Sequence, residues 1–321
     1  MDTSDKPSNL REVGGRLFNT TTEVRIPPTR QLLPELRGKP FSGDVADGVE
    51  HRRLDAQHQA VTTMLGGLFP AGSGADEILS QSSEGYKPRV LDIGTGSGAW
   101  VIDVAIKYPN AEVVGLDLAP FNHLSTPPPN CRFETGDASS GLKQYGRFDI
   151  IHARSVLQGI KDYASLCTDI AEVLNPQGIF ISVEGEIGLY DKDKVKYGPQ
   201  KEGDPDFCWA QEVTMAYLEA TRKRNPGFSD LKRVEEILKA TTGDPWNAIA
   251  GTTFFLPCGP YESGNETERN AGRLMHQSAL KVPKALQALL LASGYDAGYV
   301  NRLTEMALDE IESCRVVNFL K

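Results

Sequence analysis

The stretch VLDIGTGSG, from Val90 to Gly98, decides the fold of this chain. Its first residues are apolar and mostly β-branched, which is typical of a buried parallel strand. Gly94, Gly96 and Gly98 then allow positive φ angles and let a ligand approach the main chain. The run AWVIDVAIKY follows with apolar residues at helical spacing, and the N–H groups at its start would face such a ligand. The sequence therefore predicts a strand, a ligand-binding loop and a helix in succession.

Two acidic residues favour one ligand for this loop. A glycine-rich turn alone could hold NAD, FAD or a nucleotide phosphate. Asp92 lies two residues before the first glycine, where a carboxylate would repel a pyrophosphate and attract an ammonium group. Asp117 ends a second apolar stretch, AEVVGLD, about twenty residues beyond the loop, where a ribose-binding acid is expected. S-adenosylmethionine fits both acids, and an NAD-dependent oxidoreductase is the disfavoured alternative.

Composition narrows the classes of function. The formal net charge of −9 argues against general nucleic-acid binding, because phosphate contacts need a basic surface. The five cysteines are scattered without a C-x-x-C pair, which predicts a reducing compartment, and we expect a cytoplasmic protein. The polar N-terminus has no apolar signal core, and no stretch reaches the roughly 18 apolar residues that cross a bilayer.

Strand and helix patterns alternate between residues 88 and 185, which predicts a parallel sheet with helices on both faces. We expect an α/β fold with a Rossmann-like, doubly wound, seven-stranded sheet and a helical cap. The carboxyl ends of its strands should form one crevice. The expected parts are an N-terminal arm at 1–45, an S-adenosylmethionine-binding core at 46–188, a helical cap insertion at 189–250, and C-terminal strands and cap helices at 251–321.

Outside the alternating region the predictions are coarser. An amphipathic helix is expected over residues 46–69, and a short helical turn around Leu32, Leu33 and Leu36 in the arm. GTTFFLP and RVVNFLK are interpreted as the last two strands of the sheet. Several aromatic or soft side chains of the cap would either line an apolar pocket or pack in a core. They are Tyr190, Trp209, Tyr217, Phe255, Tyr261 and Met275.

The motifs VLDIGTGSG, VVGLDL, ETGDAS, RFDIIHARSVLQGI and LNPQGIFISVE together resemble those of class I S-adenosylmethionine-dependent methyltransferases. The similarity is closer to the fungal secondary-metabolism group that includes the LaeA-like proteins. That group shares the RLDxQH pattern at residues 53–58, PPNCRFE at 128–134 and IHAR at 151–154. Its GPW-like turn is GPY here, with Tyr261 in place of the usual Trp. The resemblance covers residues 45–321 and implies the fold and the cofactor, but no substrate.

A cofactor site at the strand ends follows from these motifs. Asp92 would meet the methionyl ammonium group, Asp117 the ribose hydroxyls and Asp137 the adenine amino group. Arg53 would bind the methionyl carboxylate, or else be a solvated helix residue. The glycines have tight packing as their alternative role, and Asp137 has an Asx-turn. The predicted set is Arg53, Asp92, Gly94, Thr95, Gly96, Gly98, Asp117, Leu118, Asp137, Ala138, Ala153 and Arg154.

Methyl transfer from a sulfonium depends mainly on holding the acceptor in line with the methyl group. A base is needed only when the acceptor carries a proton of high pKa. His152 and His58 are the predicted catalytic residues, each with a structural role as its alternative. Further candidates for a base are Asp162, Glu184 and Glu186.

The predicted activity is methylation of a small, apolar natural product at oxygen. Two alternatives stay open: a cofactor-binding regulator of secondary metabolism that acts in a protein complex, and an N- or carboxyl-methyltransferase. No His or Cys cluster has metal-ligand spacing. We expect a small-molecule substrate, no nucleic-acid or membrane partner, and the N-terminal arm as a route to a homodimer.

Overall fold

The computed structural model describes residues 10–13, 16–19, 48–81, 85–121, 126–186, 188–224, 234–241, 243, 245–314 and 318–321. The chain divides into two compact units. The sheet unit contains Leu65–Gly185 and Phe228–Thr253, and the helical unit contains Met1–Met64, Glu186–Gly227 and Phe254–Lys321. The four parts expected from the sequence divide the chain differently, and their boundaries stay predictions.

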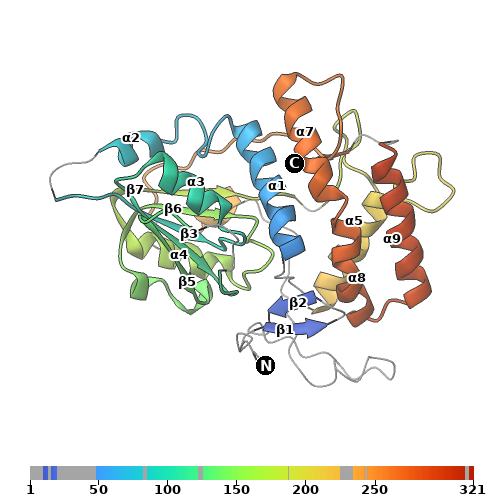
Figure 1. Cartoon of the computed structure of the whole chain (residues 1–321), viewed down its shortest axis with the longest axis horizontal. Helices are drawn as coiled ribbons and strands as arrows, with labels where there is room; N and C mark the ends of the chain where they lie inside the picture. The colour runs from blue at the N-terminus through green and yellow to red at the C-terminus, as the bar shows by residue number, and fades with distance from the viewer. Residues whose placement is uncertain are drawn as a thin grey trace. The chain divides into compact units, whose positions relative to one another are not determined.

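The sheet unit is built on five parallel strands (Figure 1). They are β3 (Arg89–Ile93), β4 (Glu112–Asp117), β5 (Cys131–Thr135), β6 (Phe148–Arg154) and β7 (Leu174–Val183). The strand order β5-β4-β3-β6-β7 reverses direction at β3, which is the switch point where ligands of such sheets bind. The predicted α/β fold class is confirmed.

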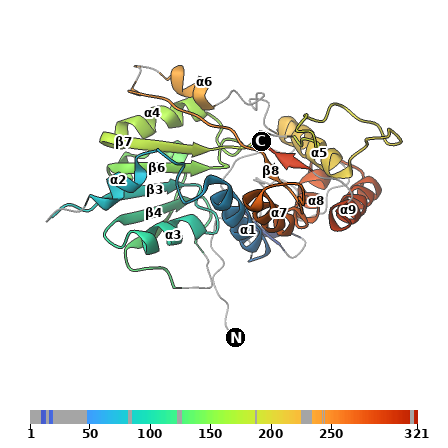
Figure 2. The same ribbon diagram turned by 90° about the horizontal axis from the view of Figure 1, so that it is seen from above.

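Helices cover both faces of this sheet (Figure 2). They are α2 (Ala75–Ser80), α3 (Ala99–Lys107), α4 (Tyr163–Val173), α6 (Val234–Lys239) and the 3-10 helices η2 (Ala138–Ser140) and η3 (Lys143–Tyr145). Val90 of β3 is buried with Trp100 of α3 on one face. Leu91 points to the other face and is buried with Leu166 of α4. Alternate residues of β3 are thus buried on opposite sides, as a doubly wound sheet requires.

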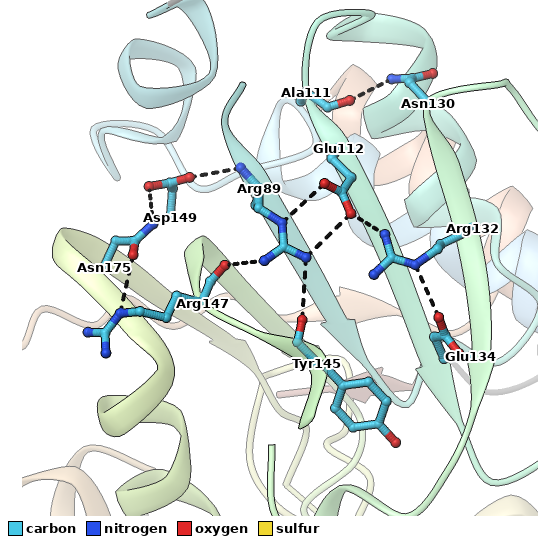
Figure 3. Close-up of polar contacts among 10 residues, drawn as sticks. All are labelled: Arg89, Ala111, Glu112, Asn130, Arg132, Glu134, Tyr145, Arg147, Asp149 and Asn175. Atoms are coloured by element: carbon cyan, nitrogen blue, oxygen red, sulfur yellow. Dashed lines mark hydrogen bonds and ion pairs between the residues drawn. The ribbon is translucent and has the colours of Figure 1, made fainter. Parts of the chain in front are cut away.

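Polar side chains tie the amino ends of the strands together (Figure 3). Arg89 of β3 donates from Nε to Glu112 of β4 at 3.1 Å, and Glu112 also pairs with Arg132 of β5. The backbone N–H of Arg89 donates to Asp149 of β6 at 2.8 Å, and the amide of Asn175 donates to the same carboxylate at 2.8 Å. These contacts align β3, β4, β5, β6 and β7 at the edge opposite the glycine loop.

The helical unit packs three helices around one apolar cluster. Val213 of α5 is buried with Leu289 of α8 and Leu303 of α9. The helices of this unit are α1 (Gly48–Leu65), α5 (Trp209–Arg224), α7 (Glu266–Ala279), α8 (Val282–Ala292) and α9 (Ala297–Glu312). Among the residues that the structure describes, no helix is both long and apolar enough to span a bilayer.

A single seven-stranded sheet is not confirmed. Among the described residues of GTTFFLP and RVVNFLK, strand pairing is confined to β8 (Leu256–Pro257) and β9 (Phe319–Leu320), which pair antiparallel with each other in the helical unit. Pro257 has no N–H group to extend the ladder. Phe319 instead packs edge to face with Tyr261, with ring centroids 5.0 Å apart. The two C-terminal strands therefore form a separate pair in the described chain.

The N-terminal arm contains an antiparallel hairpin that the sequence did not predict. Its strands are β1 (Leu10–Val13) and β2 (Arg16–Asn19). The expected helical turn around Leu32, Leu33 and Leu36 lies outside the described residues.

Part of the predicted cap is an aromatic core. Tyr190 packs edge to face with Phe255 at a centroid distance of 5.2 Å, and Phe255 packs in the same way with Phe319 at 6.4 Å. Trp209 packs with Phe207 at 4.9 Å. For Tyr190, Trp209, Phe255 and Tyr261, these contacts favour the packing alternative.

A buried carboxylate caps the start of α5. Glu310 of α9 is 8% exposed and accepts from the N–H groups of Trp209 at 3.0 Å and Ala210 at 2.9 Å. The thiol of Cys208 also donates to it at 3.3 Å. The first N–H groups of a helix have no partner inside the helix, so this side chain supplies one from another element.

We predict that Glu310→Ala lowers the free energy of unfolding by about 2 kcal/mol, because two donors to a charged acceptor lose their partner in a buried place. The measurement is chemical denaturation followed by circular dichroism. Glu305→Ala, an exposed position on the same helix, is the matched control and should change the midpoint little. Equal midpoints for the two variants would contradict the capping role.

Candidate functional site

The glycine loop after β3 is bonded to the end of β4. The N–H groups of Gly94 and Thr95 donate to the carbonyl of Leu116 at 2.8 and 3.1 Å. The N–H group of Gly96 donates to Oδ2 of Asp117 at 2.8 Å. Three consecutive N–H groups therefore shape the loop. The N–H groups that the sequence predicted to face a ligand are those at the start of α3, and that role stays a prediction.

The glycines at positions 94 and 98 are also required by packing. A Cβ atom on Gly94 would overlap Val156, and one on Gly98 would overlap the rings of Phe121 and Phe133. Those two rings stack with centroids 3.5 Å apart. All three loop glycines have positive φ, at 70°, 56° and 79°. The packing alternative therefore applies to Gly94 and Gly98, and it does not exclude a cofactor beside the loop.

Asp117 stands where the ribose-binding acid was predicted. Its Oδ1 accepts from the N–H of Ala119 at 2.9 Å, while Oδ2 accepts from Gly96. These two backbone bonds fix the plane of the carboxylate at the end of β4. Leu118 follows directly and is half-buried.

Asp137 begins η2 and accepts from the N–H of Ser139 at 2.8 Å. This is the Asx-type contact that the sequence analysis weighed against an adenine contact. Ala138 packs in the core beside it. The role of Asp137 toward adenine stays a prediction.

Asp92 and His152 form a buried pair beneath the loop. Nδ1 of His152 lies 2.7 Å from Oδ1 of Asp92, and the residues are 2% and 4% exposed. The imidazole also stacks on the indole of Trp100, with centroids 3.9 Å apart and planes 8° apart. His152 thus points into the packed side of the sheet, which favours a structural role over proton transfer with substrate.

Ala153 and Arg154 end β6. Ala153 is buried, and burial lowers the pKa of Arg154, an effect that the nearby charge of Asp92 partly offsets. Ser155 follows with a φ of 57°, and its N–H donates to the carbonyl of Val183 at 3.0 Å. The chain therefore turns sharply where β6 leaves the sheet.

Glu184 fixes the segment after this turn. Its Oε1 accepts from the N–H groups of Val156 at 3.0 Å and Leu157 at 3.2 Å. Burial raises the pKa of Glu184 to about 7, although the two N–H groups act against it. The sequence placed Glu184 among five candidates for a general base and could not rank it. The feature that pointed to Glu184 was its position directly after β7.

Arg53 and His58 lie on α1 in the helical unit. The carboxylate of Glu50 accepts from Nε of Arg53 at 2.9 and 3.0 Å. Nη1 of Arg53 donates to Gln57 at 2.8 Å and to Ser278 at 3.2 Å. His58 is buried, with Nδ1 3.5 Å from the hydroxyl of Thr62. Arg53 is therefore not a solvated residue, and both predicted roles stay predictions.

The sheet unit has features that fit the implied cofactor. Oγ1 of Thr95 is buried in the glycine loop and has no hydrogen-bond partner among the described residues. A buried hydroxyl without a partner is costly, and a bound ligand could supply one. Asp92 and Asp117 add negative charge on either side of the loop. Within the described ranges, no group of three His, Cys, Asp or Glu side chains suits a metal ion.

Comparison with known proteins shows the family of the chain. Residues 86–212 match the family model described as a methyltransferase domain. The chain is 34% identical over 226 residues to methyltransferase str2 of Strobilurus tenacellus, covering 66% of this chain and 76% of that protein. The chain belongs to the S-adenosylmethionine-dependent methyltransferases. S-adenosylmethionine is thus the cofactor that the family implies.

The relatives include LaeA-like proteins, as the motifs indicated. The chain is 39% identical over 278 residues to the secondary metabolism regulator laeA of Coprinopsis cinerea, covering 85% of this chain. It spans 64% of that regulator's length. A putative methyltransferase from an antibiotic biosynthesis pathway of Anabaena variabilis has a similar structure, with a TM-score of 0.45, 12% identity, and coverage of 76% of this chain and 92% of that one.

We predict that Glu184→Gln makes the sheet unit less sensitive to pH. The folded pKa is about 7, above the ordinary value of 4.5, so the folded state keeps a proton that the unfolded state loses. The stability present below pH 4.5 is therefore lost as pH rises toward 7, by at most about 3 kcal/mol. Urea denaturation between pH 5 and 8 measures it.

The control for this experiment is Glu172→Gln, which changes an exposed carboxylate on α4 of the same unit. That variant should follow the wild-type pH profile. If Glu184→Gln has the same pH profile as the wild type, Glu184 does not titrate as proposed.

Proposed function

We propose that the chain binds S-adenosylmethionine at the carboxyl edge of the five-stranded sheet and methylates a small, apolar natural product at oxygen. The observation that carries the proposal is the glycine loop. Its Gly96 N–H donates to Asp117, the proposed ribose-binding acid, and the buried hydroxyl of Thr95 has no hydrogen-bond partner among the described residues. The bound cofactor supplies an electrophilic methyl group on a sulfonium. The chain itself supplies binding, orientation and exclusion of water.

Each strand-end residue has a stated part in this proposal. Asp117 accepts from the ribose hydroxyls with the carboxylate plane fixed by Gly96 and Ala119. Asp92 attracts the ammonium group, and the buried hydroxyl of Thr95 bonds to the ligand. These contacts fix the donor in one orientation, which is the largest requirement of an in-line methyl transfer.

An alcohol or phenol acceptor loses a proton during transfer. Glu184 is suited to take it, because its pKa of about 7 balances basicity and ionisation at neutral pH. Its Oε1 is fixed by Val156 and Leu157, and in this proposal Oε2 accepts the proton of the substrate hydroxyl. An amine or carboxylate acceptor would need this base less, so the acceptor atom decides its importance.

A second candidate function is favoured by the name of one relative. The Coprinopsis cinerea protein is called a secondary metabolism regulator, and this chain resembles it over 85% of its own length. In that case the chain would bind the cofactor and act within a protein complex. The N-terminal arm, which includes the hairpin β1–β2, is the proposed contact for a partner or for a second copy of the chain.

We also propose that the protein works in a reducing compartment such as the cytoplasm. Its described cysteines are free thiols, and its net charge of −9 disfavours a nucleic-acid partner. A fluorescent fusion examined in cells tests the compartment.

Asp117→Asn should weaken binding of S-adenosylhomocysteine by about 2 kcal/mol, because the ribose hydroxyls lose a charged acceptor. Isothermal titration calorimetry measures this change. The control Glu172→Gln changes an exposed side chain on α4 and should bind S-adenosylhomocysteine like the wild type. An unchanged affinity in Asp117→Asn would remove Asp117 from the site.

Gly96→Val should abolish binding while the chain stays folded, because valine is strained at a φ of +56°. Gly72→Val is the matched control, since Gly72 also has a positive φ, of 74°, and a Cβ there meets nothing within 4 Å. Circular dichroism should show both variants folded. A Gly96→Val protein with normal affinity for S-adenosylhomocysteine would contradict the loop assignment.

The activity itself is tested with methyl-labelled S-adenosylmethionine and a panel of phenols, carboxylic acids and amines. Transfer to a phenol supports the O-methyltransferase, and transfer to one of the other classes corrects the acceptor atom. Cofactor binding without turnover, together with capture of a stable partner by the intact chain, favours the regulator. Binding of NADH without binding of S-adenosylhomocysteine would overturn both.

A further inference from the structure

Asp92, His152 and Arg154 lie on one face of the sheet. Asp92 of β3 is the register partner of His152 of β6, so the two side chains project to the same side. Arg154 is two residues further along β6 and projects to that side as well, toward the carboxyl edge. An acid and an imidazole thus lie side by side on β3 and β6, and a guanidinium group lies further along β6 toward the carboxyl edge.

The imidazole is fixed from two directions. Its Nδ1 lies 2.7 Å from Asp92, and its ring lies flat on Trp100. The indole of Trp100 is itself fixed, because its Nε1 donates to the carbonyl of Leu68 at 3.0 Å. A carboxylate can only accept, so the imidazole donates from Nδ1. The direction of the Asp92 carboxylate therefore depends on the ring stack.

A carboxylate that is 4% exposed is costly unless donors and opposite charges surround it. His152 supplies one donor, and Arg154 lies close enough for its charge to interact with Asp92. The ammonium group of a ligand would add another positive charge beside Asp92, and the carboxylate of the same ligand would meet Arg154. This is the pattern that a zwitterionic amino acid presents.

We propose that Asp92 and Arg154 bind the amino-acid half of the methyl donor, and that His152 is a positioning residue which aims Asp92 at the ammonium group. The proposal rests on the proposed cofactor site. It gives the methionyl carboxylate to Arg154 instead of Arg53, whose guanidinium group already bonds to Glu50, Gln57 and Ser278. His152 is then part of binding and takes no proton from substrate.

Two substitutions separate the functions of the histidine. His152→Phe keeps a flat ring against Trp100 and removes the donor to Asp92. His152→Asn places an amide N–H near the position of Nδ1 and removes the stacked ring. The pair of variants therefore distinguishes a loss of the hydrogen bond from a loss of packing.

Four probes measured by calorimetry read out the amino-acid half. They are S-adenosylhomocysteine, its desamino analogue, its decarboxylated analogue and 5′-methylthioadenosine, which lacks both groups. His152→Phe should weaken S-adenosylhomocysteine and the decarboxylated analogue about tenfold or more and leave the other two unchanged. His152→Asn should recover part of the loss. Arg154→Met should weaken only the probes that carry a carboxylate.

Equal weakening of all four probes in a folded His152→Phe protein would make the residue merely structural and overturn the proposal. So would wild-type affinity for S-adenosylhomocysteine in that variant. If neither variant folds, the wild-type Nδ1 proton of His152 is followed by nuclear magnetic resonance. It should shift with S-adenosylhomocysteine and stay in place with 5′-methylthioadenosine, and an equal response to both overturns the proposal. A wild-type protein that binds no probe instead refutes the proposed function itself.

Discussion

The hydrogen bonds from the glycine loop to the end of β4 are the constraint on which the sheet unit depends. Gly94, Thr95 and Gly96 all donate to Leu116 or Asp117, so the loop cannot move without the neighbouring strand. The predicted ribose acid is one of these acceptors. The same carboxylate therefore shapes the loop and stands at the end of β4, where we propose that the ribose binds.

The sheet unit was largely predictable from the sequence, because each of its strands combines a continuous apolar run with a turn signal. The run before Gly94 and the run that ends at Asp117 predicted two strands of a parallel sheet, and these are β3 and β4, which pair in parallel. Burial on both faces leaves a strand little alternative. The strand-end positions of Asp92 and Asp117 were predictable for the same reason, and their contacts with the cofactor stay predictions.

Contacts between distant side chains were not predictable. The sequence left Arg53 two alternatives, the methionyl carboxylate or solvent. Neither includes Glu50, Gln57 and Ser278, which bond to its guanidinium group. Ser278 is 225 residues away. GTTFFLP has a strand composition, but its Phe255 packs on Tyr190 and strand pairing is confined to Leu256 and Pro257. Apolar periodicity reports burial and does not report the partner, so such segments need the tertiary structure.

Val156 contacts both the loop after β3 and the segment after β7. Its side chain fills the space beside Gly94, and its N–H is bonded to Glu184 after β7. A larger residue at position 94 would push Val156 away from that carboxylate. Positions 94, 156 and 184 should consequently change together during evolution. A larger side chain at position 94 would require a smaller one at position 156, or a different acceptor at position 184.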